Sequence, residues 1–255
     1  LGTREMDAVR SALFPRFAIM PVLWRKVEDQ EERLRRLTFE QQNVLKLLAN
    51  HKQAAIRGVA GSGKTILALG KAQEMARKGY RTLFLCYNKP LKEWIETAIP
   101  EDAEDNLVVE TYHGLVADLT AKAGTDFRPE PGQKADQVFW DGKAPECLEE
   151  ALLSLGNEHK FDALIVDEGQ DFRDLWWDSL ENVFRDPSEK ECYYVFYDPK
   201  QNLYVENPSL PAELGKPFEL PINCRNTIKI AEHCAELVNI DPGVKDGAPI
   251  GDKPE

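Results

Sequence analysis

The sequence lacks several features that would assign it to a class at once. Its 255 residues contain no apolar run near the ~20 residues of a membrane-spanning helix, no internal repeat and no low-complexity tract. The sequence also lacks an excess of positive charge, with 32 basic against 44 acidic residues. The resulting net charge of −12 argues against binding nucleic acid through bulk charge alone, but it is compatible with a local basic groove. The hydrophobic content of 42% and the charged content of 30% are typical of a soluble globular protein, so we expect no membrane association.

Cysteine and histidine form no metal-binding pattern. The five cysteines include no Cys-x-x-Cys pair, and the four histidines lie far apart, so a zinc site has no support. The first residues carry acids and are followed by no apolar block of the kind found in signal peptides. The odd cysteine count and the missing secretion signal predict reduced thiols and a cytoplasmic location. Because the chain begins with Leu1 and not with methionine, we expect a piece of a longer protein.

What the sequence does contain is a glycine-rich stretch of the pattern Gly-x4-Gly-Lys-Ser/Thr, at residues 58–65. A short apolar strand is expected before it, at 53–57, and a helix after it, to about Lys78, where Gly79 ends the helix. In such a loop, glycines let backbone N–H groups close around phosphate oxygens, and the helix N-terminus adds favourable partial charge. The predicted nucleotide-binding residues here are Gly58, Gly61, Ser62, Gly63, Lys64, Thr65 and Ile66. The alternative is a glycine-rich turn that binds nothing.

Two residues of this loop have distinct predicted roles toward ATP and Mg²⁺. Lys64 is a mobile point charge for the β- and γ-phosphates, and the Thr65 hydroxyl is a ligand for Mg²⁺. Turnover also needs a second metal ligand and a group that positions water. The apolar strand expected at 161–168 ends in Asp167 and Glu168, at the strand end where ligands collect in open α/β sheets. We predict that Asp167 holds Mg²⁺ and that Glu168 orients and deprotonates the attacking water, the alternative being two acids that merely end a strand.

Strands and helices alternate along the chain, which predicts an α/β fold with a three-layer sandwich and a mostly parallel sheet. Further strands are expected at 81–87, 107–112 and 192–197, and helices at 92–98, 115–123, 146–155 and 176–184. Residues 124–145 are rich in Gly, Pro, Asp and Lys, and we interpret them as part of a small insertion, at about 116–155, anchored by Phe139 and Trp140. Trp176 and Trp177 are expected to pack in the core and not to stack on bases.

The acidic pair belongs to a longer motif. Asp167-Glu168-Gly169-Gln170-Asp171 resembles the Asp-Glu-x-Gln-Asp box of superfamily 1 DNA helicases of the UvrD/Rep type. Other segments resemble that family's motifs in the same order, over about residues 37–231: the glutamine motif at 37–41, motif Ia at 85–91, motif Ib at 111–115, motif III at 197–204 and motif IV at 220–227. The residues of these motifs are most similar to those of helicase-like proteins that sometimes carry an N-terminal nuclease-related domain.

The resemblance implies a P-loop NTPase domain of the RecA-like type and roles for residues outside the loop. Gln41 would contact the adenine edge, Gln201 would sense the γ-phosphate, and Arg225 would contact it, so the catalytic candidates are Lys64, Glu168, Gln201 and Arg225. Motifs Ia, Ib and III would contact single-stranded DNA, or RNA, through Tyr87, Asn88, Lys89, Thr111, His113 and Tyr204. For His113 the alternative to a phosphate donor is a loop histidine with its hydrogen bonds satisfied. For Tyr87, Asn88 and Lys89 the alternative is a solvated loop.

The resemblance also implies a division of the chain. We expect an N-terminal extension at 1–36, the RecA-like ATPase domain at 37–216, and a motif IV segment at 217–255 that begins a truncated second domain. Cys224 stands where the family commonly has a tyrosine, and Ile66 where it often has an arginine. Motifs V and VI, which belong to the second RecA-like domain, do not occur before Glu255.

Two functions follow from these observations. The first is the ATPase domain of a DNA helicase or single-stranded DNA translocase, slow on its own because the missing domain supplies an arginine. The second is a helicase-derived ATP switch that regulates a nuclease or another partner without unwinding. The sequence argues against a small-molecule kinase with the same loop, because such a kinase would leave Gln170, Asp171 and Gln201 without a role.

Overall fold

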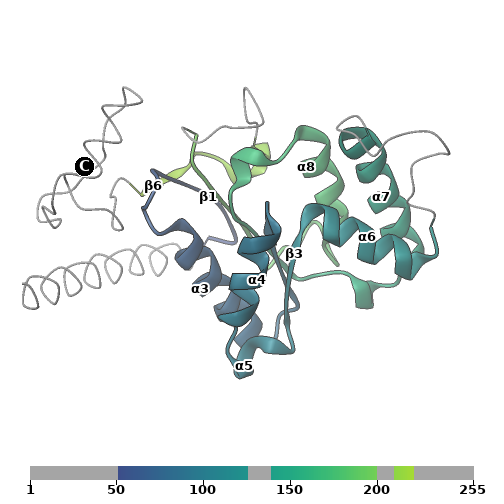
Figure 1. The fold of residues 1–255 in the computed structure, drawn as a ribbon, viewed down its shortest axis with the longest axis horizontal. Helices are drawn as coiled ribbons and strands as arrows, with labels where there is room; N and C mark the ends of the chain where they lie inside the picture. Colours follow the sequence, from purple (N-terminus) through teal and green to yellow (C-terminus); the bar gives the residue numbers. More distant parts are fainter. Residues whose placement is uncertain (1–50, 126–138, 200–209, 221–255) are drawn as a thin grey trace, which may run out of the picture.

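A computed structural model describes residues 51–125, 139–199 and 210–220. In these residues six strands form one sheet in which every pairing is parallel (Figure 1). The order across the sheet is β3-β2-β4-β5-β1-β6. The strands are β1 (Gln53–Gly58), β2 (Thr82–Cys86), β3 (Leu107–Thr111), β4 (Ala163–Val166), β5 (Cys192–Tyr197) and β6 (Phe218–Leu220). The predicted α/β sheet is therefore confirmed, and its described part is parallel throughout.

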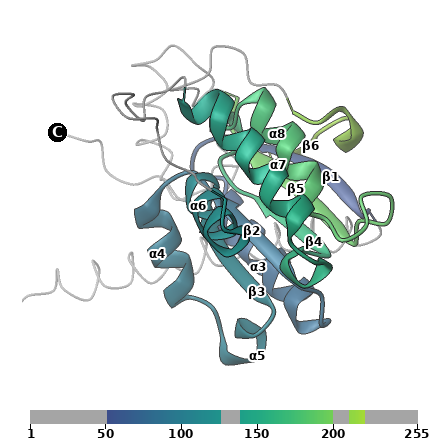
Figure 2. The same cartoon turned by 90° about the vertical axis from the view of Figure 1, so that its right-hand side faces the viewer.

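Helices cover both faces of the sheet, as the two views in Figures 1 and 2 show. One face carries α3 (Lys64–Arg77), α4 (Lys89–Thr97) and α5 (Glu101–Glu104), whose buried residues share a core with Ile56, Phe84 and Ile165. The opposite face carries α6 (Tyr112–Ala123), α7 (Ala144–Ser154) and α8 (Asp174–Leu180), which share a core with neighbouring residues of the same strands. Successive strand residues thus point into two different cores, which explains why these strands are apolar throughout.

Short helical turns complete the described chain. A π-helical turn, Phe139–Lys143, leads into α7, and 3-10 turns occupy Asn157–His159, Gly169–Asp171, Glu181–Val183 and Ala212–Leu214. Both α6 and α7 pack against each other and against the sheet, and Phe139 is buried beside α7. Residues 126–138, the middle of the predicted insertion, lie outside the described ranges. The predicted division of the chain into an extension, an ATPase domain and a second-domain segment stays a prediction.

Two helices begin three residues earlier than expected, and in each case the residue before the helix caps it. The Asn88 side chain accepts a hydrogen bond from Leu91 N, 2.9 Å away, so α4 begins at Lys89 and places Pro90 in its first turn, where proline is tolerated. The Thr111 hydroxyl accepts one from Gly114 N at 3.1 Å, so α6 begins at Tyr112. Gly114, which lies just before the predicted helix, is therefore helical.

The strand that was expected at 161–168, before the acidic pair Asp167 and Glu168, is also shorter than predicted. β4 ends at Val166, because Glu168 adopts a left-handed backbone conformation with φ 55° and turns the chain out of the sheet. By contrast, β5 spans the predicted residues, and Trp176 and Trp177 are buried as expected. Among the described residues, no helix combines the length and the apolar character that a membrane span requires.

Candidate nucleotide-binding site

The glycine-rich loop connects β1 to α3 in the predicted manner. Gly61 and Gly63 have φ values of 75° and 81°, in the left-handed region that glycine tolerates and other residues rarely adopt. Ser62 N donates to Val59 O at 3.1 Å, which closes a turn, and α3 then begins at Lys64. The first turn of α3 contains no acidic residue, and no side chain caps it. Its N-terminal N–H groups therefore form a favourable place for an anion.

Close packing at Gly58 fixes the shape of the loop. A Cβ atom at this position would meet the Ser62 Oγ at 2.3 Å and the Lys64 Cγ at 3.2 Å, so only glycine fits without a shift of the loop. The Ser62 side chain is buried, and its hydroxyl has no hydrogen-bond partner among the described residues. Buried hydroxyls without partners are rare in proteins, so this one is consistent with a loop built around an absent polar ligand.

Lys64 folds back over its own loop. Its ammonium donates to Gly58 O at 3.0 Å and to Val59 O at 3.2 Å, and the side chain is only 6% exposed. The same nitrogen lies 3.7 Å from a carboxylate oxygen of Asp198, an ion pair that is too long for a hydrogen bond. Lys64 thus carries a buried charge that is held by two backbone carbonyl oxygens and one long ion pair, at the site where a phosphate would bind.

Asp167 lies next to this loop. It is fully buried, and neither carboxylate oxygen has a hydrogen-bond partner among the described residues. Burial and the nearby Glu168 carboxylate raise the pKa of Asp167 to about 7, while the Thr65 hydroxyl and the Lys64 ammonium lower that pKa in part. Both groups are therefore close to Asp167, although no contact between them meets the geometry of a hydrogen bond. An unpartnered buried carboxylate beside a hydroxyl fits Mg²⁺, and Lys64 with the loop amides fits phosphate.

The Glu168 side chain is positioned by Gln170 and, through it, by Asp198. The sequence predicted no contact between these residues and Glu168. Its carboxylate accepts a hydrogen bond from the Gln170 amide at 2.7 Å, and the Gln170 oxygen accepts one from Asp198 N at 2.9 Å. Gln170 and Asp198 are both buried. The motifs contained both residues, but the pattern gave no sign that they meet, because they are 28 positions apart. Glu168 itself is the one non-glycine residue in the described ranges with positive φ, a strain often found at functional sites.

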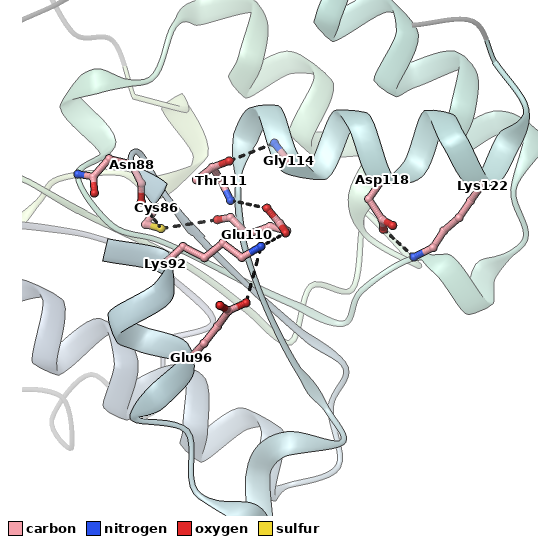
Figure 3. Close-up of polar contacts among 9 residues, drawn as sticks. All are labelled: Cys86, Asn88, Lys92, Glu96, Glu110, Thr111, Gly114, Asp118 and Lys122. Atoms are coloured by element: carbon pink, nitrogen blue, oxygen red, sulfur yellow. Dashed lines mark hydrogen bonds and ion pairs between the residues drawn. The ribbon is translucent and has the colours of Figure 1, made fainter. Parts of the chain in front are cut away.

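The predicted nucleic-acid residues of motifs Ia and Ib also lie together. β2 and β3 are neighbours, and Cys86 pairs with Thr111, so the residues that follow both strands gather at one edge of the sheet (Figure 3). Asn88 and Thr111 each cap a helix, as described above. Lys89 is exposed on the first turn of α4, and Tyr87 is half-buried against the core.

A lysine at this edge is neutralised by acids. Figure 3 shows the Lys92 ammonium paired with the Glu110 carboxylate. The same ammonium lies 3.7 Å from a carboxylate oxygen of Glu96. Glu110 additionally accepts a hydrogen bond from Thr111 N at 2.9 Å. The hydrogen bond and charge of Glu110 raise the pKa of Lys92, although partial burial opposes them. The Lys92 charge therefore lies beside two carboxylates.

His113 packs against an aromatic cluster. Its ring lies edge-on to Trp176 at a centroid distance of 5.0 Å, and Trp176 stacks on Tyr112 at 4.3 Å. Burial, and to a lesser degree the charge of Arg173, lower the pKa of His113, which favours the neutral ring. This arrangement favours a packed histidine over a donor to a nucleic-acid phosphate.

Several predicted residues cannot be placed. Gln41, Gln201, Tyr204 and Arg225 lie outside the described residues. Ile66 lies in the first turn of α3 with 49% of its surface exposed. The structure thus brings together Gly58, Ser62, Lys64, Thr65, Asp167 and Glu168 at one end of the sheet, with Gln170 and Asp198 as additions.

A six-stranded parallel sheet between two helical layers, with a lysine-bearing glycine loop beside a strand-tip acid, defines a P-loop NTPase domain of the RecA-like type. Residues 51–231 match the family model of the Schlafen group 3 DNA/RNA helicase domain, and the chain belongs to this family.

A solved structure, that of Bacteroides Pif1 bound to ssDNA, is also similar to this chain. The identity is 19%, the TM-score is 0.32, and the match covers 69% of this chain and 34% of the Pif1 chain. The chain thus spans about a third of that protein, and a likeness at this level indicates nothing about shared activity. No match was found among curated proteins.

Proposed function

We propose that this chain is the ATP-binding and ATP-hydrolysing motor domain of a DNA helicase or single-stranded DNA translocase of the UvrD/Rep type. The observation that carries the proposal is the buried, unpartnered Asp167 carboxylate beside Lys64 and Thr65. A carboxylate in this state is unfavourable in the ligand-free protein and becomes favourable when MgATP supplies a cation to it. Membership of a helicase-domain family supports the same function.

Each placed residue has a role in this proposal. Lys64 leaves the Gly58 and Val59 carbonyl oxygens and binds the β- and γ-phosphates, while the backbone N–H groups at the N-terminus of α3 donate hydrogen bonds to phosphate oxygens. Thr65 and Asp167 hold Mg²⁺, which offsets phosphate charge when bound. Glu168, oriented by Gln170, positions the attacking water and accepts its proton. By resemblance, Gln41 contacts adenine, and Gln201 and Arg225 contact the γ-phosphate.

A second candidate is the ATP switch that regulates a nuclease-related domain or another partner without unwinding. It is favoured by the edge formed by β2 and β3, where Asn88 and Thr111 are used as helix caps and Lys92 is paired with Glu110. Fewer groups are then available for a nucleic-acid strand.

The test measures MgATP binding and hydrolysis, with and without single-stranded DNA or RNA, for the wild type and two variants. Lys64→Ala should weaken nucleotide binding by about tenfold or more, because a charge-assisted contact is lost. Glu168→Gln should keep the affinity and lower turnover by about 10²–10⁴-fold, because the general base is removed. Lys78→Ala, at an exposed lysine directly after the same helix, is the matched control and should change neither quantity.

The outcomes separate the candidates. Turnover that a single strand stimulates favours the motor, whereas tight binding with slow turnover that no strand stimulates favours the switch. Unchanged affinity in Lys64→Ala would show that the proposed site is wrong. Rapid strand-stimulated turnover would contradict our expectation that the isolated chain is slow.

A further inference from the structure

Four polar residues form a connected path beside the proposed phosphate site. Lys64 lies 3.7 Å from the Asp198 carboxylate, and the Asp198 backbone N–H donates to Gln170 at 2.9 Å. Gln170 in turn donates to Glu168 at 2.7 Å. The side chains of Lys64 and Asp198 are 6% and 2% exposed, and Gln170 is 1% exposed. This path joins the proposed phosphate-binding lysine to the proposed general base.

The order of the strands explains why Asp198 occupies this place. β5 lies between β1, which leads into the glycine loop, and β4, which leads to the acidic pair. Arg57 pairs with Tyr197, so Asp198 follows at the tip of β5, next to the start of the loop at Gly58. From this central position its carboxylate reaches Lys64 on one side, and its backbone N–H reaches Gln170 on the other.

The contact between Asp198 and Lys64 has a direct consequence for ligand binding. An ammonium group has three donors, and here two of them are used by the Gly58 and Val59 carbonyl oxygens. The charge of Asp198, in a buried environment, stabilises the ammonium in this folded-back position. A triphosphate needs the same ammonium and carries negative charge itself, so it competes with Asp198 for Lys64.

We propose that Asp198 is a positioning residue that holds Lys64 over the loop in the nucleotide-free protein and releases it when a triphosphate binds. Because the Asp198 backbone remains bonded to Gln170, release of the lysine is coupled to the position of Glu168. This inference rests on the proposed function of the site. It adds a role for a residue at the tip of β5 that neither the loop motif nor the acidic box contains.

The experiment is a double-mutant cycle on the full chain with MgATP as the titrant. Asp198→Asn should tighten binding by about three- to tenfold, because the competing charge is removed while size and backbone N–H are kept. In a Lys64→Ala background the same substitution should leave the remaining affinity unchanged. Asp198→Glu keeps the charge and should stay within about twofold of the wild type. Weaker binding in Asp198→Asn, or an equal change in both backgrounds, would overturn the proposal.

A second measurement keeps the inference testable without any nucleotide. Asp198→Asn and Lys64→Ala should each lower the melting temperature by about 2–4 °C, and the double variant should lose clearly less than the sum of the two. Additive losses would overturn the pairing. If the wild type binds no nucleotide, the proposed function fails, but this thermal cycle still decides whether Asp198 holds Lys64. Asp198→Ala replaces Asp198→Asn in both measurements if the asparagine variant does not fold.

Discussion

The tips of β1, β4 and β5 lie along the same edge of the sheet as the tips of β2 and β3, but their polar groups are in opposite situations. At the first group, Asp167 and the Ser62 hydroxyl are buried without a described partner, and Glu168 has a strained backbone. At the second group, Asn88 and Thr111 cap helices, and Lys92 is paired with Glu110 (Figure 3). A buried polar group without a partner costs about 1–3 kcal/mol, so a polar ligand would relieve a cost at the first group that the capping and paired residues of the second group do not carry.

The largest effect should come from the residue that shapes the loop. Gly58→Ala places a methyl group against the Ser62 Oγ and the Lys64 stem, so we expect MgATP affinity to fall by about tenfold or more and the free energy of unfolding to fall by about 1–3 kcal/mol. Isothermal titration and denaturant unfolding measure the two quantities. Gly70→Ala is the control: Gly70 lies within α3 with open space around it, so alanine should stabilise by about 0.5–1 kcal/mol and leave affinity unchanged. Equal MgATP affinities for the Gly58→Ala and Gly70→Ala variants would show that Gly58 does not shape a nucleotide-binding loop.

A smaller effect is expected where the polar groups are already satisfied. Thr111→Ala should lower the free energy of unfolding by about 0.5–2 kcal/mol, because the Gly114 N–H loses its capping partner, and MgATP affinity should not change. Asn88→Ala removes the equivalent cap of α4 and should behave alike. Denaturant unfolding checks both. If either variant kept its stability but lost single-strand binding, the substituted residue would be a nucleic-acid contact and not only a helix cap.

The smallest effect should be on single-stranded DNA binding, when the Lys92 charge at the tips of β2 and β3 loses its acidic partner. Glu110→Gln removes the main partner of Lys92, so single-stranded DNA should bind about two- to threefold more tightly, and the salt dependence should steepen by about 0.7 in log–log slope. Asp118→Asn, which frees Lys122 from an exposed pair on α6, is the control and should change neither value. Fluorescence anisotropy at several salt concentrations measures both. Equal effects of the two variants would mean that Lys92 has no special position.

Much of the fold followed from the sequence because its signals are local. The glycine pattern fixed the loop and the start of α3, and the apolar run of β5 marked that strand at both ends. The starts of α4 and α6 were wrong because Pro90 and Gly114 usually interrupt helices. Here Asn88 and Thr111 provide caps, and Gly114 leaves room for the Glu110 side chain, whose oxygen a Cβ at residue 114 would meet at 1.9 Å.

The sequence by itself determined the chemical identity of the site: a lysine and a hydroxyl on a glycine loop, and two acids at the end of an apolar strand. Only the tertiary structure decided which groups surround them, because apolar runs specify strands without specifying their order in a sheet. Placing β5 between β1 and β4 brought Asp198 to both Lys64 and Gln170. The contact between Lys64 and Asp198 joins residues more than a hundred positions apart, and it depends on the global packing, which no local pattern encodes.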